Sequence, residues 1–174
     1  MKYVDEFRDP ELARRLVERI RARSRHPLRL MEFCGGHTHA ILRYGIRQML
    51  PPMVEMLSGP GCPVCVTANR DLDYTIALAR QAGIIIATFG DMLRVPGSYS
   101  SLQQVRSEGA DVRIVYSTLD ALEMAKTNLT KSVVFLGIGF ETTAPTVAAS
   151  VLQAQAQSVE NYYVFCAHKL TPPA

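Results

Sequence analysis

The sequence predicts an α/β protein in which parallel β-strands are covered by helices. Two apolar runs, "IIIATF" and "SVVFLGI", have apolar residues on both faces, which is typical of strands buried in a parallel sheet. The segment "DLDYTIALARQAG" has helical length and ends on a glycine. Apolar runs alternate with such segments along the chain, and they occupy residues 28–33, 53–58, 84–89, 112–117, 132–138 and 162–167.

The first predicted element is a helix over residues 10–23. Asp9 offers a side-chain oxygen for the N-cap, and Pro10 suits the first helical position. Glu11 places a negative charge near the positive end of the helix dipole. Within this helix Leu12, Leu16, Val17 and Ile20 recur at helical spacing, so we expect the many arginines to form a solvated opposite face and not a nucleic-acid site.

Length and composition predict a globular protein without a nucleic-acid or membrane partner. The chain has 174 residues, 48% hydrophobic and 20% charged, and a net charge of only +3. Its apolar runs are all shorter than the roughly 18 residues that cross a bilayer. The start "MKYVDEFRDPELARR" carries charges where a signal peptide would be apolar. We therefore expect a cytoplasmic protein.

We place a soft domain boundary near residue 118, because "STLDALEMAKTNL" begins a new helix after the fourth apolar run. Residues 1–118 would form a first α/β lobe that carries the cysteine-containing loops. Residues 119–174 would begin a second lobe. The last run is followed by "HKLTPPA" where a crossover helix is expected, so we predict an incomplete second lobe.

The unusual residues follow the ends of predicted strands. In a parallel sheet the carboxyl ends of the strands share one edge, where ligands bind. The loops expected at such an edge are "CGGHTH", "GPGCPVC", "GDMLRVPGS" and "GFETTAP". Their common placement predicts a functional site.

The loop "CGGHTH" suggests a metal ligand or a reactive thiol. We expect Gly35 and Gly36 to adopt backbone angles closed to other residues, and so to hold Cys34 at the strand tip. His37 and His39 would enter the following helix. Cys34 and His37 have the spacing to bind one metal ion, whereas His39 favours an ordinary structural role.

The loop "GPGCPVC" suggests a redox pair. Pro63 suits a first helical position, which makes Cys62 a candidate N-cap, and a C-x-x-C pair at a helix start can form a disulfide. With Cys34 and His37, Cys62 and Cys65 also make a possible zinc set, which we rank lower because the chain has ample core. Cys166 lies in the apolar run "YYVFCA" and is expected to be a core residue.

The other two loops supply polar groups. Asp91 and Arg94 would form an ordinary ion pair or bind a ligand. In "GIGFETT", Thr142 stands where a dinucleotide-binding loop needs a third glycine, so that fingerprint fails. Glu141 would stabilise a helix N-terminus or act as an acid near the thiols, and Thr142 and Thr143 are alternative caps.

Taken together in this order and spacing, "CGGHTHAI", "GPGCPVCV", "FGDMLRVPG", "GADVRIVYS" and "GFETTAP" closely resemble the HypD family of hydrogenase maturation proteins. The resemblance runs along essentially the whole chain from "VDEFRDPE" onward. It implies a scaffold that works with the small partner HypC, in the HypC–HypD complex. On that scaffold an iron ion acquires cyanide and carbon monoxide, the Fe(CN)2CO group, for [NiFe]-hydrogenase. HypE is implied as a source of the cyanide.

The resemblance also implies roles for individual residues. Cys34 would hold the iron, with His37 beside it, and Cys62 and Cys65 would undergo thiol–disulfide exchange. The residues themselves, and not the resemblance, add Glu141 as a further candidate catalytic group. The residues expected to line the binding site are Gly35, Gly36, Asp91, Arg94 and Thr142. We expect Cys34, Cys62 and Cys65 to meet in one pocket.

This sequence departs from the family in length. Family members are about twice as long and carry a [4Fe-4S] cluster on cysteines of their C-terminal part, which have no counterpart here. The chain thus resembles an N-terminal half, and no cluster is expected on it. Two other interpretations stay open: a thiol–disulfide oxidoreductase in which Cys62 attacks and Cys65 resolves, and a zinc-stabilised interaction domain.

Overall fold

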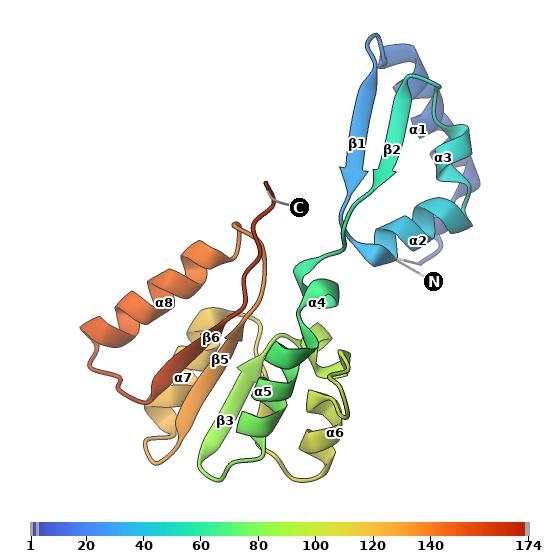
Figure 1. Cartoon of the computed structure of the whole chain (residues 1–174). Coiled ribbons are helices and arrows are strands. Elements are labelled where there is room, and N and C mark those ends of the chain that lie inside the picture. The colour runs from blue at the N-terminus through green and yellow to red at the C-terminus, as the bar shows by residue number, and fades with distance from the viewer. Residues whose placement is uncertain (1, 3, 173–174) are drawn as a thin grey trace. The chain divides into compact units, whose positions relative to one another are not determined.

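The computed structural model describes residues 2 and 4–172 of the 174-residue chain. By the contacts within it, the chain forms two compact units, Met1–Gly61 (unit 1) and Cys62–Ala174 (unit 2). Each unit has a parallel sheet with helices packed beside it (Figure 1). The predicted α/β class is therefore confirmed.

Unit 1 is built around two parallel strands, β1 (Leu28–Glu32) and β2 (Val54–Ser58), paired from Leu28 opposite Val54 to Glu32 opposite Ser58. Its helices are η1 (Glu6–Arg8), α1 (Pro10–Arg23), α2 (Gly35–Arg43) and α3 (Ile46–Met49). The predicted start of α1 is confirmed, since the Asp9 carboxylate accepts hydrogen bonds from the backbone N–H groups of Glu11 (2.8 Å) and Leu12 (3.1 Å). None of the residues of α1 is fully buried.

Unit 2 has a four-stranded parallel sheet in the order β4-β3-β5-β6. The strands are β3 (Ile84–Thr88), β4 (Val112–Ile114), β5 (Ser132–Gly137) and β6 (Tyr162–Cys166). The strands β3 and β5 are in the centre and almost wholly buried, as their continuous apolar runs predicted. The helices are α4 (Pro63–Val66), α5 (Asn69–Ala79), η2 (Gly90–Arg94), α6 (Leu102–Ser107), α7 (Thr118–Thr127) and α8 (Ala144–Ala156).

Helices cover both faces of this sheet (Figure 1). One core cluster joins α5 and α6 to the sheet, with Leu72 and Leu102 among its buried members. The other joins α7 and α8 to the opposite face, with Leu122 and Val147. Because the side chains of a strand alternate between faces, β3 contributes Ile86 to the first cluster and its neighbours to the second. Unit 2 is therefore a doubly wound layer with a core on each side.

Strands from both sides of residue 118, near which we placed a soft domain boundary, belong to the same sheet of unit 2. The strand β3 pairs with β4 before that point and with β5 after it. The division of the chain into compact units falls between Gly61 and Cys62. The helix expected after the fourth strand does form, since Ser117 and Asp120 make a capping box at the start of α7.

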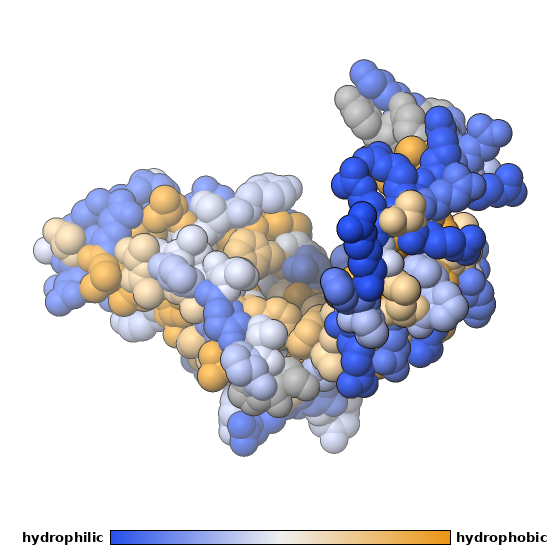
Figure 2. All heavy atoms as spheres, turned by 90° about the horizontal axis from the view of Figure 1, so that it is seen from above, coloured by the Kyte–Doolittle hydropathy of each residue, from blue (hydrophilic) through white to orange (hydrophobic). Residues whose placement is uncertain are grey.

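The two units differ in the character of the side chains on the one face that Figure 2 shows. Figure 2 shows mostly hydrophilic side chains over the visible face of unit 1 and more apolar ones over that of unit 2. On α8, Leu152 is 66% exposed. Within the part of the chain that the structure describes, we find no helix with the length and apolar character needed to span a membrane.

Candidate functional site

The loop that follows β1 places Cys34 at the N-cap of α2. Cys34 has extended backbone angles (φ −87°, ψ 121°), and its half-buried thiol makes no capping hydrogen bond. His37 and His39 lie in α2, as predicted, and both are exposed. The positive end of the helix dipole is therefore next to a sulfur atom that capping does not use.

The prediction for Gly35 and Gly36 was wrong. Both lie in the first turn of α2, and neither is among the glycines with a positive φ. A β-carbon built on Gly35 would have no atom within 4 Å, and one on Gly36 would be 3.7 Å from the Cys34 sulfur. These glycines leave the space beside Cys34 open, and the backbone angles there are those that any helical residue adopts.

Glu32, the last residue of β1, is a functional candidate that sequence reasoning missed. Its carboxylate accepts hydrogen bonds from the Cys34 backbone N–H and from the Thr38 hydroxyl (3.1 Å). Its Oε1 lies 3.5 Å from His37 Nδ1. An acidic residue at the end of an apolar run, two positions before the cysteine, was the signal that could have revealed it.

The C-x-x-C pair lies at the start of unit 2. Cys62 is the N-cap of the four-residue helix α4 and Pro63 its first residue, which confirms that part of the prediction. The sulfur atoms of Cys62 and Cys65 are 3.5 Å apart, so no disulfide bond joins them. Val64 packs against the core cluster that also contains Ala167, which fixes α4 on the unit.

The loop after β3 does not contain the ion pair that the sequence suggested as one alternative. Asp91 and Arg94 are both exposed on η2, and no ion pair between them is found among the described residues. Both border a hollow of about 420 Å³, together with Arg106. With two guanidinium groups and one carboxylate, the hollow favours an anionic occupant.

The loop after β5 holds Glu141 against the end of the described chain. Its carboxylate accepts hydrogen bonds from the backbone N–H (2.6 Å) and the hydroxyl (2.7 Å) of Thr171. The hydroxyl hydrogen bond is the main reason why the pKa of Glu141 is below its usual range. Thr142 is exposed, and Thr143 occupies the N-cap of α8 without a side-chain capping bond. Thr143 therefore takes the N-cap position that we considered, but its side chain does not make the capping bond, and Thr142 is not the N-cap.

The expectation that Cys166 is a core residue was wrong. Cys166 is exposed at the end of the edge strand β6, and its sulfur lies 3.1 Å from His168 Nδ1. Burial lowers the pKa of His168, and its Nε2 is buried without a hydrogen-bond partner. An edge strand has no neighbour on one side, so an apolar sequence there does not guarantee burial.

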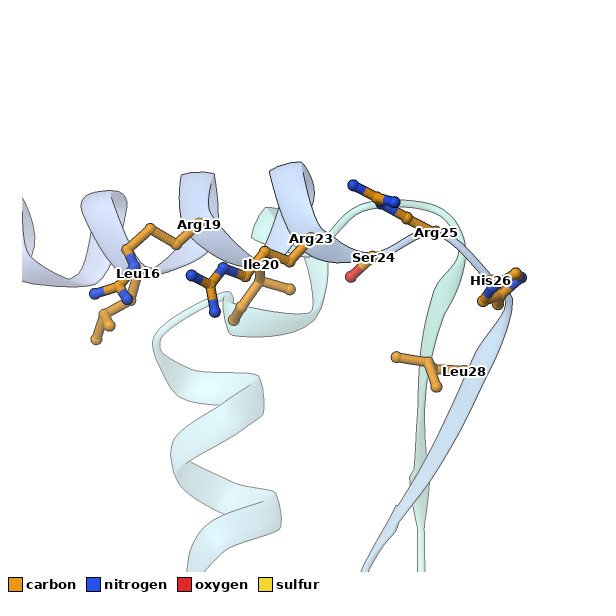
Figure 3. Close-up of a pocket in the computed structure, with 8 residues that line it drawn as sticks. All are labelled: Leu16, Arg19, Ile20, Arg23, Ser24, Arg25, His26 and Leu28. Atoms are coloured by element: carbon orange, nitrogen blue, oxygen red, sulfur yellow. The ribbon is translucent and has the colours of Figure 1, made fainter.

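A larger hollow, of about 620 Å³, lies between the end of α1 and the start of β1 (Figure 3). Its lining residues are Leu16, Arg19, Ile20, Arg23, Ser24, Arg25, His26 and Leu28. The arginines of α1 are exposed as predicted, but Arg19 and Arg23 border the same hollow as the apolar Leu16 and Ile20. None of the predicted site residues lines it.

The candidate ligands occur in pairs. In unit 1, Cys34 is the N-cap of α2 and His37 lies in its first turn; in unit 2, Cys62 is the N-cap of α4 and Cys65 lies in its first turn. Over residues 2 and 4–172, no group of three or more His, Cys, Asp or Glu side chains is arranged to hold a metal ion. Within unit 1, Cys34 and His37 would thus supply two of the ligands of a bound metal ion.

The fold and these loops define an α/β protein that carries cysteines at helix starts. A family model for HypD, described as "Hydrogenase formation hypA family", matches residues 11–174. This chain belongs to the HypD family.

Similar proteins carry the corresponding name. The hydrogenase maturation factor HypD of Escherichia coli (strain K12) is 51% identical over 97% of this chain and 47% of its own length. That of Azotobacter vinelandii is 55% identical over 100% of this chain and 47% of its own length. HypD2 of Bradyrhizobium diazoefficiens is 53% identical with the same coverage, 100% and 47%. The chain thus spans about half the length of these curated relatives.

Proposed function

We propose that this chain acts in the maturation of [NiFe]-hydrogenase, as part of a scaffold on which an iron ion acquires cyanide and carbon monoxide. HypC is the proposed protein partner and HypE the proposed source of cyanide. Support comes from membership of the HypD family and from relatives named hydrogenase maturation factors. The iron complex is the substrate of this process.

The observation that carries the proposal is the position of the Cys34 thiol. It lies at the start of the nine-residue helix α2, half-buried and not used for capping. A thiolate is a soft ligand that suits iron with strong-field diatomic ligands, and the helix dipole favours negative charge at this place. With only Cys34 and His37 from the protein, positions on the iron stay open for cyanide, carbon monoxide and a ligand from HypC.

Cys62 and Cys65 are the proposed redox pair. Their sulfur atoms are 3.5 Å apart, so a small movement suffices to form the disulfide. In thiol–disulfide exchange the two thiols become one disulfide, while the disulfide of the reacting partner takes up the two electrons and two protons and becomes two thiols. The same distance favours a second candidate function, a thiol–disulfide oxidoreductase that exchanges this pair with the disulfide of another protein.

The test is anaerobic purification from cells that contain the other maturation proteins, with HypC, followed by metal analysis and infrared spectroscopy. We expect iron with cyanide and carbon monoxide bands in the wild type and in Cys166→Ala, which removes an exposed cysteine of unit 2. Cys34→Ala should lose both the iron and the bands. Retention of iron by Cys34→Ala would overturn the proposal.

Two other results would each favour another function. Stoichiometric zinc without iron would support a zinc-stabilised interaction domain. Absence of both metals, together with a reversible disulfide between Cys62 and Cys65, would support the oxidoreductase.

A further inference from the structure

We propose that Glu32 is the positioning residue of the iron site: its carboxylate holds Cys34 at the helix start and orients the His37 ring so that Nε2 is the nitrogen presented to the metal. This inference rests on the proposed function, and it assigns a role to a residue outside the cysteine and histidine motif.

The burial of Glu32 supports this role. Its side chain is only 12% exposed, although a carboxylate loses strong hydration on burial. The loss is offset by hydrogen bonds from the Cys34 backbone N–H and the Thr38 hydroxyl, and His37 Nδ1 lies 3.5 Å from the same carboxylate. A surface carboxylate without a positioning role would not need contacts with all three of these residues.

The contacts to Cys34 and Thr38 fix the first turn of α2. Oε1 accepts from the Cys34 N–H, and Oε2 accepts from the Thr38 hydroxyl at 3.1 Å. The Thr38 N–H in turn donates to the Cys34 carbonyl at 2.9 Å. The Cys34 backbone is thus held at both its N–H and its carbonyl. This arrangement limits the directions in which the thiol can point.

The contact to His37 selects one ring nitrogen. Nδ1 lies 3.5 Å from Oε1 of Glu32, whereas the His37 side chain as a whole is 77% exposed. A carboxylate next to Nδ1 favours the tautomer with the proton on that atom, which leaves the lone pair on Nε2. Metal-binding histidines commonly use this pairing, in which a carboxylate on one nitrogen sets the orientation of the other.

The backbone of Glu32 links this loop to the one that leads to Cys62. The Glu32 carbonyl accepts a hydrogen bond from the Gly59 N–H at 2.6 Å. A β-carbon at Gly59 would lie 2.6 Å from the same carbonyl oxygen, so only glycine allows this approach. Glu32 therefore joins the ends of β1 and β2, from which both cysteine-containing segments continue.

The test compares Glu32→Gln with Glu55→Gln in the full 174-residue chain. Glu55 is a matched control, because it lies on the paired strand β2 and forms an exposed ion pair with Arg29 at 2.9 Å. Two measurements are made without metal: amide hydrogen exchange at Cys34 and Thr38, and the His37 ring tautomer by 15N NMR. The third is anaerobic titration with Fe2+ alone.

For Glu32→Gln we expect exchange at Cys34 to become about 10- to 100-fold faster, since a hydrogen bond to a charged acceptor is lost. The His37 tautomers should become mixed. The Fe2+ affinity should fall about 10- to 100-fold, which is typical when the group that orients a metal ligand is changed. Glu55→Gln should leave the three quantities within about twofold of the wild type.

An unchanged His37 tautomer and an unchanged Fe2+ affinity in Glu32→Gln would overturn the role of Glu32. The proposed function would still stand in that case if iron binding depends on Cys34. Failure of the proposed function gives a different result. If Cys34→Ala binds Fe2+ as well as the wild type does, the proposed function is overturned. The exchange and tautomer data still show whether Glu32 orders the loop.

Discussion

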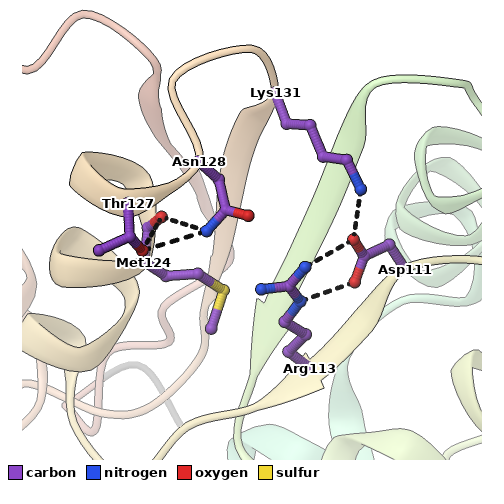
Figure 4. A network of polar contacts seen from close by, with 6 residues as sticks. All are labelled: Asp111, Arg113, Met124, Thr127, Asn128 and Lys131. Carbon is purple, nitrogen blue, oxygen red and sulfur yellow. Dashed lines mark hydrogen bonds and ion pairs between the residues drawn. The ribbon is translucent and has the colours of Figure 1, made fainter.

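Replacement of Asp111 by asparagine should destabilise unit 2, because this carboxylate joins two loops at the amino end of its sheet. Asp111 accepts two hydrogen bonds from the Arg113 guanidinium, at 2.7 and 2.9 Å, and one from Lys131 Nζ at 2.9 Å (Figure 4). Arg113 is on β4, and Lys131 immediately precedes β5. The network therefore links the segment that leads into the edge strand β4 with the segment that leads into the central strand β5.

The size of the effect follows from the pKa of Asp111. The pKa of Asp111 is lowered from 3.8 to about 2. The main cause is the hydrogen bond from Arg113, and the hydrogen bond from Lys131 adds to it. This difference corresponds to roughly 2.4 kcal/mol. Arg113 and Lys131 are 38% and 41% exposed, so solvent screening reduces the expected loss of unfolding free energy to about 1–2 kcal/mol.

The sign of the pH dependence is determined by the lowered pKa. A carboxyl group with a lower pKa in the folded state stabilises that state at pH values above its unfolded pKa. That contribution is lost as the pH falls from about 4 through about 2, and it vanishes below that pH, where Asp111 is protonated in both states. The difference between wild type and Asp111→Asn should therefore be constant near neutral pH and shrink in acid.

The assay is urea unfolding followed by amide hydrogen exchange in β3, which reports on unit 2 alone. Glu108→Gln is the control, because Glu108 forms a single exposed ion pair with Arg80 at 3.2 Å and should cost less than about 0.5 kcal/mol. If Asp111→Asn is as stable as the wild type at neutral pH, or if its deficit persists in acid, this account of the network is wrong.

Two further predictions concern the carboxyl end of the same sheet. Gly139→Ala should destabilise the chain by about 1–3 kcal/mol in thermal unfolding, because φ is positive there (159°) and the added β-carbon would overlap the Thr143 side chain. Gly83→Ala is the control, because Gly83 has a positive φ of 79° but a β-carbon there would have no atom within 4 Å, and it should cost only about 1 kcal/mol. Equal losses of stability in the two variants would mean that rotation of the Thr143 side chain relieves the clash at residue 139. His168→Ala should slow alkylation of Cys166 by iodoacetamide several-fold, measured by peptide mass spectrometry, because Nδ1 lies 3.1 Å from the Cys166 sulfur and is placed to accept the thiol proton as the sulfur reacts. An unchanged rate would show that the imidazole does not assist that thiol.

Local features of the sequence predicted the elements well. The helix start at Asp9, the N-cap at Cys62 and the buried strands β3 and β5 all follow from the chemistry of neighbouring residues. Capping depends on a few residues in a row, and burial on both faces requires a continuous apolar run. Such features can be recognised without knowledge of the rest of the chain.

The environment of single residues was harder to predict. Cys166 lies in an apolar run, yet β6 is an edge strand and leaves it exposed. Glu32 was overlooked because its three contacts depend on how the chain turns after β1. The candidate pair Asp91 and Arg94 is close in sequence, but η2 leaves both side chains exposed and unpaired with each other.

The amino-acid sequence by itself determined that the protein is α/β, that Cys34 and Cys62 stand at helix starts after strands, and that its motifs resemble those of the HypD family. The tertiary structure decided which strands pair. It separated β1 and β2 from the sheet β4-β3-β5-β6, and it gathered Cys34, Thr38 and His37 around the carboxylate of Glu32. The physical reason is that strand pairing and the burial of a charge depend on groups brought together only when the whole chain folds.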